Sequence, residues 1–439
     1  MKKVVKFGGS SLASARQFKK VKSIITADKT RSYVVPSAPG KRDGKDTKVT
    51  DLLYQCYEAV SADQSYKRIL EQIKKRFYDI INGLDLNLNL DFEFDKIEEN
   101  FLQKAGADYA ASRGEYLNGI IMAHYLNFPF VDAADVICFD ENGCFLPEET
   151  NAELAAHLKS MKQAIIPGFY GAKPDGTIVT FSRGGSDITG SLVARALHAD
   201  IYENWTDVSG FLVADPRIIR NPVPIETITY RELRELSYMG ASVLHEDAIF
   251  PVRKAGIPIN IKNTNRPEDP GTMIVESTSK KSLYTITGIA GKKGFCSIII
   301  DKAMMNTEIG FGRKVLEVFE RNQISFEHMP SGIDTMTVFV HQDEFQEKEQ
   351  AVISGIHRAV HPDVIDLESD LALIAVVGRG MKANRGTAAR IFAALSHAKI
   401  NVKMIDQGSS ELNVIIGVQN EDFEGAIRAI YDIFVTTAL

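Results

Sequence analysis

The first 275 residues alternate between short β-branched runs and amphipathic stretches. The runs KVVKF, SYVVPS, AIIPGFY, TIVTFS and IPINIKN predict strands, and stretches such as the one carrying Phe18, Val21 and Ile25 have the spacing of a helix. Strands that alternate with helices usually form a parallel sheet with helices on its faces, and ligands gather where the strands end. The pattern therefore predicts an α/β domain over residues 1–275, with a mostly parallel sheet flanked by helices.

Residues 84–94, LDLNLNLDFEF, differ from their surroundings. Apolar and polar residues alternate along this segment without a break. That alternation has the period of a half-buried strand, so we predict a strand here.

The second part of the chain repeats itself. After the polar stretch ESTSKKS, which ends the first domain, matching residues recur 76 positions apart (386 − 310 = 76), as in Gly310 and Gly386 or Gly332 and Gly408. Each copy has the order strand, glycine-containing turn, helix, strand and strand, which is typical of a small α+β module of the ferredoxin type. We predict two such modules, at residues 284–360 and 368–439. The pair suits a ligand sensor, and duplication without a ligand is the alternative.

Composition narrows the class of protein. A chain of 439 residues suits two or three domains. Its 51 basic and 57 acidic residues include no long block of like charge, so small-molecule partners are favoured over DNA or RNA. The four cysteines have no C-x-x-C spacing and predict neither a zinc site nor a disulfide framework. The N-terminal apolar run ends at Lys6 and LALIAVVG is far shorter than a membrane span, so we expect a soluble cytoplasmic protein.

A first glycine loop follows the run KVVKF. Its residues Gly8, Gly9 and Ser10 lead into a helix without the GKS or GKT of a Walker loop. Adjacent glycines let backbone N–H groups approach an anion, the helix N-terminus adds positive potential, and Lys6 can place its charge on a phosphate. On this feature alone, a phosphate site and a plain strand-to-helix turn are both open.

Two later stretches carry further candidates. In TIVTFSRGGSDITGSLVARAL, Arg183 can hold a carboxylate or phosphate through two hydrogen bonds, and Asp187 can either cap the helix or contact a substrate. Two glycine loops at strand ends predict facing anion sites, which suit a phosphoryl donor and an acidic acceptor. In ENWTDVSGFLVADPR, Asp215 and Arg217 flank a proline, and a structural turn is the stronger interpretation of that pair. Trp205 is expected in the core.

Taken in order, KFGGSS, SRGGSD, WTDVSGFLVADPR and GASVLHEDAI resemble the aspartokinases of the amino-acid kinase family. The likeness covers nearly the whole chain, since the repeated modules resemble the paired ACT domains of these enzymes, and the length resembles the monofunctional form. It implies an enzyme that transfers the γ-phosphoryl group of ATP to the β-carboxylate of L-aspartate in lysine, threonine and methionine biosynthesis. It also implies that Mg²⁺ is carried by the nucleotide, without a metal site of the protein's own.

The resemblance assigns roles to individual residues. It implies catalytic roles for Lys6, Arg183 and Asp187. It implies a phosphate clamp of Lys6, Gly8, Gly9 and Ser10. It implies an aspartate pocket of Ser37, Thr50, Glu115, Arg183, Ser186 and Asp187. It implies nucleotide contacts from Thr206, Asp207, Asp215, Arg217, Lys262 and Asn263.

The sequence departs from the family in two places. Ser242 stands where some members have a lysine that serves the nucleotide. The family also tends to have a helical subdomain near residues 84–94, which conflicts with the strand predicted there.

The first repeated module has a candidate effector site. Its loop at Gly310 precedes a helix whose N-terminus can bind a carboxylate, and Glu327 can pair with an ammonium group. The resemblance implies an end-product effector, with lysine favoured, that binds between modules of two subunits of a homodimer or homotetramer. The site would consist of Met305, Gly310, Phe311, Gly312, Phe326 and Glu327.

Two rival functions are open. Another amino-acid kinase, acting on acetylglutamate or glutamate, would share the Lys6 loop, but SRGGSD and the paired modules argue against it. A non-catalytic metabolite sensor would keep the fold, but the presence of Lys6, Glu115, Arg183 and Asp187 together argues against that function.

Overall fold

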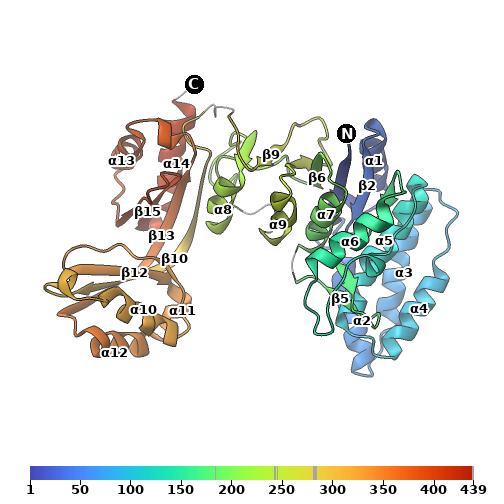
Figure 1. Ribbon diagram of the computed structural model, residues 1–439, viewed down its shortest axis with the longest axis horizontal. Helices are drawn as coiled ribbons and strands as arrows, with labels where there is room; N and C mark the ends of the chain where they lie inside the picture. The colour runs from blue at the N-terminus through green and yellow to red at the C-terminus, as the bar shows by residue number, and fades with distance from the viewer. Residues whose placement is uncertain (183, 242–243, 245, 280–283, 438–439) are drawn as a thin grey trace. The chain divides into compact units, whose positions relative to one another are not determined.

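The computed structural model describes residues 1–182, 184–241, 244, 246–279 and 284–437, which form two compact units (Figure 1). The first unit comprises Met1–Phe211, Glu226–Tyr230 and Val243–Thr278. The second comprises Leu212–Ile225, Arg231–Ser242 and Ser279–Leu439. Two short segments from within residues 1–275 therefore belong to the second unit.

The first unit is built on a sheet in which seven of the described strands are ordered β3-β2-β1-β6-β8-β9-β7. The strands are β1 (Lys3–Phe7), β2 (Arg31–Pro36), β3 (Ala164–Ile165), β6 (Ile201–Thr206), β7 (Thr227–Thr229), β8 (Ile259–Asn263) and β9 (Thr272–Val275). Neighbouring strands are parallel except for β8 and β9. The prediction of a mostly parallel sheet is confirmed.

Helices flank this sheet. They are α1 (Ala15–Ala27), α2 (Val49–Ser61), α3 (Lys67–Gly83), α4 (Asp91–Leu102), α5 (Ala107–Leu126), α6 (Pro147–Leu158), α7 (Gly185–Ala196) and α9 (Glu246–Lys254), with 3-10 turns at Gly9–Leu12 and Ala133–Asp135. Helices α1, α5 and α7 pack on the strands, whereas α2, α3 and α4 gather around α5 (Figure 1). Strand β1 suits this setting because Val4, Val5 and Phe7 are fully buried, as is usual for a parallel strand covered on both faces.

The runs AIIPGFY and TIVTFS contribute less to the main sheet than the alternation suggests. Strand β3 ends before Pro167, which has no N–H to donate, and Phe169 has a positive φ of 82°. The chain then turns into a separate hairpin in which β4 (Tyr170–Ala172) pairs antiparallel with β5 (Ile178–Thr180). The second glycine loop therefore follows a hairpin strand.

The strand predicted at residues 84–94 is wrong. Residues 84–90 form an irregular connection with a positive φ at Asp85, and residues from Asp91 onward belong to α4. The alternation is real, because Leu84 and Leu90 are buried while the intervening polar residues are exposed. The alternation arises because one side of the connection packs on the helices and the other side faces solvent. It does not arise from pairing with another strand. The Asn89 Oδ1 accepts a hydrogen bond from the Asp91 N–H at 2.6 Å and so helps to start the helix.

The second unit is built on an antiparallel sheet, in which the described strands are ordered β11-β12-β10-β13-β15-β14. The strands are β10 (Gly288–Asp301), β11 (Phe326–His328), β12 (Thr335–His341), β13 (Val364–Val377), β14 (Met404–Asp406) and β15 (Asn413–Gln419). The helices are α8 (Tyr230–Tyr238), α10 (Phe311–Arg321), α11 (Gln342–Gln346), α12 (Glu349–Val360), α13 (Thr387–His397) and α14 (Phe423–Tyr431), with 3-10 turns at Met305–Thr307, Met381–Ala383 and Asn420–Asp422 and a π-helix at Asp432–Thr436.

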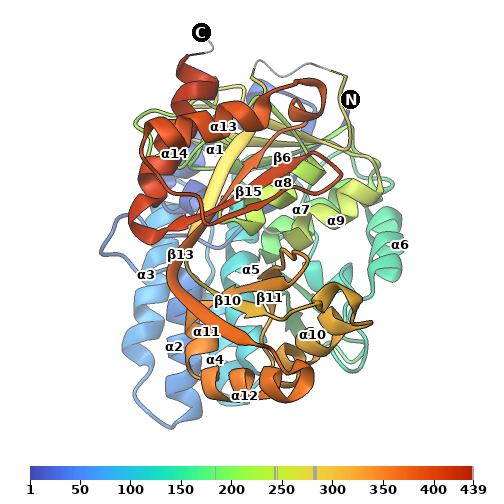
Figure 2. The same cartoon turned by 90° about the vertical axis from the view of Figure 1, so that its left-hand side faces the viewer.

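The predicted repeat is confirmed in this unit. Strand β13 begins 76 residues after β10 (364 − 288 = 76), and α13 begins 76 residues after α10 (387 − 311 = 76). The two long strands pair with each other from Gly288 opposite Val377 to Asp301 opposite Val364. Figure 2 shows them running from the part of the unit with α13 and α14 to the part with α10 and α12. Both repeats therefore contribute to one continuous sheet.

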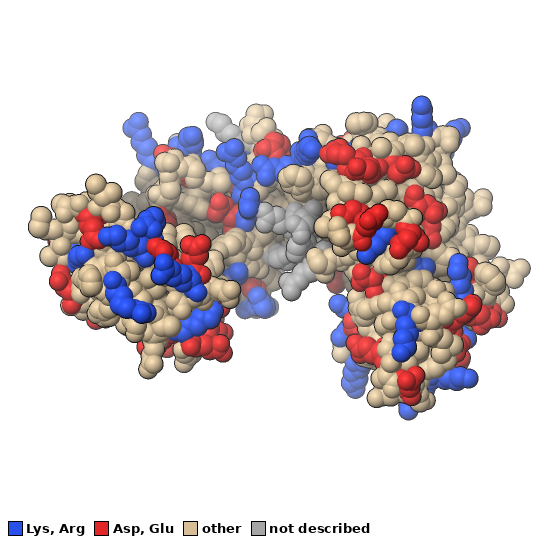
Figure 3. All heavy atoms as spheres, turned by 60° about the horizontal axis from the view of Figure 1, so that its bottom comes forward, with Lys and Arg blue, Asp and Glu red and all other residues tan. Residues whose placement is uncertain are grey.

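The surface carries both signs of charge. Figure 3 shows basic and acidic side chains intermixed on the drawn face of both units. Across the described part of the chain, no helix combines the length and the apolar character needed to cross a membrane.

Two phenylalanines test the helix at residues 91–102. In a strand, Phe92 and Phe94 would share one face, whereas in α4 they are about 200° apart. Phe94 is fully buried and Phe92 is 76% exposed. We expect Phe94→Ala to lower the free energy of unfolding by about 3–5 kcal/mol and Phe92→Ala to change it by less than about 0.5 kcal/mol. Urea unfolding of both variants measures this difference, and equal losses would contradict the helix.

Candidate active site

The residues that follow four parallel strands lie next to one another. The Gly8 N–H, just after β1, donates to the Trp205 carbonyl in β6 at 2.9 Å. The Ser37 N–H, just after β2, donates to the Phe7 carbonyl at 3.0 Å, and the Thr264 N–H, just after β8, donates to the Thr206 carbonyl at 2.8 Å. The carboxyl ends of β1, β2, β6 and β8 therefore form one edge, where parallel sheets usually bind ligands.

Lys6 supplies a buried positive charge at this edge. Its side chain is 10% exposed, and its Nζ lies 2.6 Å from the Asp187 Oδ1. The same oxygen accepts a hydrogen bond from the Asn204 Nδ2 at 2.7 Å. Lys6 and Asn204 are register partners in the parallel strands β1 and β6, so the backbone pairing sets both side chains beside Asp187.

The first glycine loop crosses the loop after β2 at very close range. The Gly40 N–H donates to the Gly9 carbonyl at 2.8 Å. A Cβ atom on Gly40 would lie 2.5 Å from the Gly9 carbonyl carbon, and one on Gly8 would lie 3.6 Å from the Lys6 Nζ. Glycine is required at position 40 because any side chain would push the two backbones apart. The backbone of the first loop thus stays beside the Lys6 ammonium group, and Ser10 continues it into the 3-10 turn at Gly9–Leu12.

The second glycine loop starts α7. Gly184 is the N-cap residue with a positive φ of 59°, and Asp187 is the third residue of the helix. The alternative in which Asp187 caps the helix is therefore wrong, and its carboxylate pairs with Lys6 instead. Ser186 is buried against Gly168. Arg183 lies outside the described residues.

Helix α5 brings Glu115 to the same loops. Glu115 is 6% exposed, and its carboxylate accepts a hydrogen bond from the Ala38 N–H. Burial raises the pKa of Glu115 from its ordinary 4.5 to about 8, against the opposing effects of this hydrogen bond and of the Lys6 charge. On the same helix, the Asn118 Nδ2 donates to the Ser37 carbonyl at 2.6 Å. Thr50 is half-buried in the first turn of α2.

The proposed nucleotide contacts are divided between the units. In the first unit, Thr206 and Asn263 are register partners at the ends of β6 and β8, and Asp207 follows as an exposed residue. Burial lowers the pKa of Lys262, whose Nζ lies 5.3 Å from the centre of the Trp205 ring. The expectation that Trp205 belongs to the core is confirmed, since it is fully buried.

In the second unit, the Arg217 Nη2 lies 2.6 Å from the Asp215 Oδ2. The two side chains that flank Pro216 therefore pair with each other, as the interpretation of this segment as a structural turn predicts. Ser242 lies outside the described residues. Among those that are described, no group of three or more His, Cys, Asp or Glu side chains is gathered to hold a metal ion.

Sequence reasoning missed three residues that shape this edge. Asn204 holds Asp187, Asn118 holds the loop after β2, and Gly40 allows the loops to cross. A signal existed for Asn204, because an amide inside the apolar run before Thr206 has to find a buried partner. No local signal marks Gly40, because its partner is thirty-one positions away in the sequence (40 − 9 = 31).

The candidate effector residues lie in the first repeat of the second unit. Met305 is buried in a 3-10 turn, and Gly310 is the N-cap of α10 with a positive φ of 79°. Phe311 and Gly312 form the first turn of that helix, and Phe326 is 43% exposed in β11. The Glu327 carboxylate lies 3.2 Å from the His341 Nε2 and accepts a hydrogen bond from the Tyr238 hydroxyl. Burial and this bond raise the pKa of Tyr238 to about 12.

Known proteins with the same organisation identify the family. Residues 1–263 match the amino acid kinase family, and residues 374–434 match the ACT domain. Aspartokinase 3 of Bacillus subtilis is 42% identical over 455 aligned positions, which cover 100% of this chain and 99% of its own length. This chain belongs to the aspartokinases.

Solved structures agree with this assignment. The aspartate kinase of Clostridium acetobutylicum is 51% identical, with a TM-score of 0.91 over 99% of this chain and 100% of that chain. Aspartokinase III of Escherichia coli, solved with aspartate and ADP and also with lysine and aspartate, shares the fold at 22% identity and TM-scores of 0.72 and 0.73. The resemblance predicted from the sequence is confirmed, and the chain is a phosphotransferase with ACT regulatory domains.

The raised pKa of Glu115 makes the stability of this aspartokinase depend on pH. In the unfolded chain Glu115 ionises near 4.5, whereas in the folded chain it keeps its proton up to about 8. Its contribution to the free energy of unfolding is therefore complete below 4.5 and is lost as the pH rises through 8. We expect Glu115→Gln to become more stable relative to the wild type over this range, by an amount on the order of a few kcal/mol. Urea unfolding at several pH values measures the difference, and a constant difference would contradict the raised pKa.

Proposed function

We propose that this aspartokinase transfers the γ-phosphoryl group of ATP to the β-carboxylate of L-aspartate, giving 4-phospho-L-aspartate and ADP. This reaction would be the first step of lysine, threonine and methionine biosynthesis. The names of its relatives and the aspartate and ADP bound to the E. coli enzyme support this substrate pair. The cytoplasmic location expected from the sequence is part of the same proposal.

The observation that carries this proposal is the position of the Lys6 ammonium group. It lies beside the first glycine loop and 2.6 Å from Asp187 at the start of the second glycine-loop helix. A phosphoryl group held between the two loops would meet one fixed cation and backbone N–H groups. Asp187 and Asn204 would keep the cation pointed at that position before the substrate arrives.

The chemistry requires charge neutralisation more than proton transfer. An aspartate side chain has an ordinary pKa near 4, so at neutral pH it attacks as a carboxylate and no general base is needed. The obstacle is repulsion between two anions, which Lys6 and the loop N–H groups would reduce at the transferred phosphoryl group. Mg²⁺ would arrive bound to the ATP phosphates and supply further positive charge, as it commonly does in kinases.

Glu115 is well placed to receive the substrate ammonium group. It is buried beside the loop that carries Ser37. A cation at this position would favour the ionised carboxylate, so binding of aspartate would release the Glu115 proton at neutral pH. Arg183 would hold the α-carboxylate, with Ser186 and Thr50 completing the pocket. The resemblance also proposes nucleotide contacts from Thr206, Asp207, Lys262 and Asn263 of the first unit and from Asp215 and Arg217 of the second.

Removing the Lys6 charge tests the proposed mechanism. We expect Lys6→Ala to lower aspartate-dependent ADP formation by about 10³-fold or more, because the main cation at the phosphoryl group is lost. The matched control is Lys19→Ala, which removes an exposed lysine from α1 and should leave turnover unchanged. Circular dichroism and thermal unfolding check that both variants fold. Near-normal turnover in a folded Lys6→Ala protein would reject the mechanism.

We also propose that an end-product amino acid, most simply lysine, inhibits the enzyme by binding to the first ACT module of a homo-oligomer. The lysine bound to the E. coli enzyme supports this choice. In this chain, the N-terminus of α10 offers N–H groups to a carboxylate, and Glu327 offers a carboxylate to an ammonium group. An inhibitor must bind one state of the enzyme more tightly than the other, and an intersubunit site provides such a difference.

Inhibition curves test the effector site. We expect Glu327→Ala to raise the lysine concentration for half-inhibition by about tenfold or more, because a charge-assisted contact is lost. The control Glu320→Ala removes an exposed carboxylate from α10 and should leave the curve unchanged. Uninhibited turnover should be the same in both variants. Unchanged lysine sensitivity in Glu327→Ala would exclude this residue from the effector site.

A further inference from the structure

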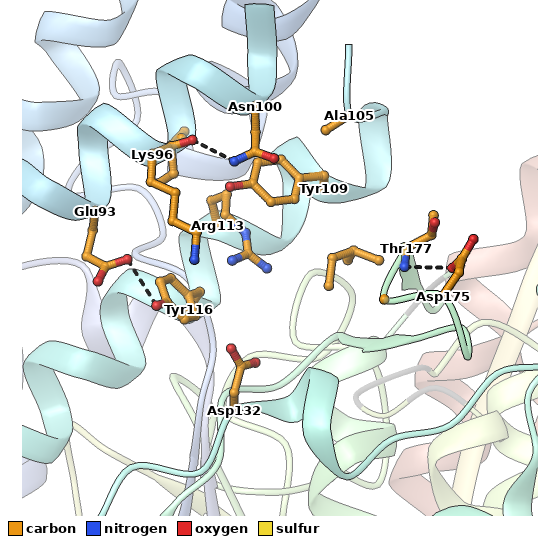
Figure 4. Close-up of a pocket in the computed structure, with 13 residues that line it drawn as sticks. Glu93, Lys96, Asn100, Ala105, Tyr109, Arg113, Tyr116, Asp132, Asp175 and Thr177 are labelled. Atoms are coloured by element: carbon orange, nitrogen blue, oxygen red, sulfur yellow. Dashed lines mark hydrogen bonds between the residues drawn. The ribbon is translucent and has the colours of Figure 1, made fainter. Parts of the chain in front are cut away.

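A pocket of the first unit lies beside α5, and Lys6 does not line it. It has a volume of about 410 Å³ and is bordered by α4, α5 and the turn of the β4–β5 hairpin (Figure 4). Arg113 and Glu115 are two positions apart on α5 and therefore lie about 200° apart around its axis. Arg113 lines this pocket, whereas Glu115 faces the loop after β2.

Arg113 is a buried cation that leaves one of its hydrogen-bond donors without a partner in the described part of the chain. It is 6% exposed, and its guanidinium carbon lies 4.6 Å from the ring centres of both Tyr109 and Tyr116 and 5.2 Å from that of Tyr170. The rings contact its faces, so its N–H edge is what remains for polar partners. The Nε donates to the Ser112 Oγ at 3.0 Å, while the Nη2 has no hydrogen-bond partner in the described part of the chain. A buried guanidinium with an unused donor is costly unless a ligand or solvent satisfies it.

The pocket also has carboxylates opposite this cation. Asp132 faces Arg113 across the cavity in Figure 4 and is held in place by the Tyr170 hydroxyl at 2.6 Å. Glu93 accepts a hydrogen bond from the Tyr116 hydroxyl at 3.0 Å. Both carboxylates are therefore fixed by the same tyrosines that surround Arg113. One end of the pocket suits an anion and the other suits a cation.

We propose that this pocket binds a small zwitterion of the amino-acid type, with its carboxylate on Arg113 and its ammonium group on Asp132. A guanidinium matches a carboxylate through two parallel hydrogen bonds. Lys96 also lines the pocket, so the cations Arg113 and Lys96 face the carboxylates Asp132 and Glu93 there. A phosphate would leave these two carboxylates without a positive group of the ligand, so the mixed lining favours a zwitterion over a plain anion. The volume is within the range of small-molecule sites, so an amino acid with a side chain of moderate size can fit.

Thermal unfolding of the full chain with single compounds tests this site. The panel consists of neutral L-amino acids, with acetate, ethylamine and inorganic phosphate as separate probes. Aspartate and lysine are left out because the proposed substrate and effector sites would bind them. We expect at least one amino acid to raise the unfolding midpoint by about 2–4 °C, and acetate or ethylamine alone to have little effect.

Three substitutions test whether the amino acid binds in this pocket. Arg113→Lys keeps the charge but loses the paired donors, and Asp132→Asn removes the partner of the ammonium group. Ala105→Trp fills the rim of the cavity without touching the buried network, so it serves if either of the others fails to fold. The shift should disappear in these variants and persist in Lys6→Ala. The proposal is overturned if no amino acid shifts the midpoint, if the shift survives Arg113→Lys and Ala105→Trp, or if phosphate alone produces it.

Discussion

The contact between Lys6 and Asp187 joins the elements that form the candidate active site. Moving an ammonium group out of water costs several kcal/mol unless a close partner compensates. Here the partner is a carboxylate 2.6 Å away that also accepts the Asn204 amide. Because Lys6 is on β1, Asn204 on β6 and Asp187 on α7, this contact links the start of the second glycine-loop helix to the central strands.

A second constraint acts on the other side of Lys6. The first glycine loop and the loop after β2 cross so closely that position 40 has no room for a side chain. Helix α5 holds that crossing through Asn118 and places Glu115 beside it. The edge therefore combines one fixed cation with a carboxyl group that burial keeps neutral. This combination can receive a ligand that carries both an anionic and a cationic group.

The two units contain different kinds of sheet, one mostly parallel and one antiparallel. The parallel sheet of the first unit collects strand ends at one edge, where charged groups from distant segments can meet. The antiparallel sheet of the second unit joins two repeats through the long pairing of β10 and β13, so both repeats share one continuous sheet. Helix α5 carries charged residues on two sides. Glu115 lies on one side, and Arg113 lies on the other, where it contacts three tyrosine rings.

The sequence by itself determined the features that depend on local pattern. The runs KVVKF, SYVVPS and IPINIKN predicted three strands of the main sheet, the 76-residue offset predicted the paired modules, and the glycine loops marked the edge with the candidate site. The same local rules failed at residues 84–94, because an extended connection packed on helices has the alternation of a strand without a strand to pair with. They also could not show that β4 and β5 leave the main sheet after Pro167. Tertiary structure alone decided the Lys6–Asp187–Asn204 contact, the Gly9–Gly40 crossing and the Arg113 pocket, because each depends on residues that only folding brings within a few ångströms.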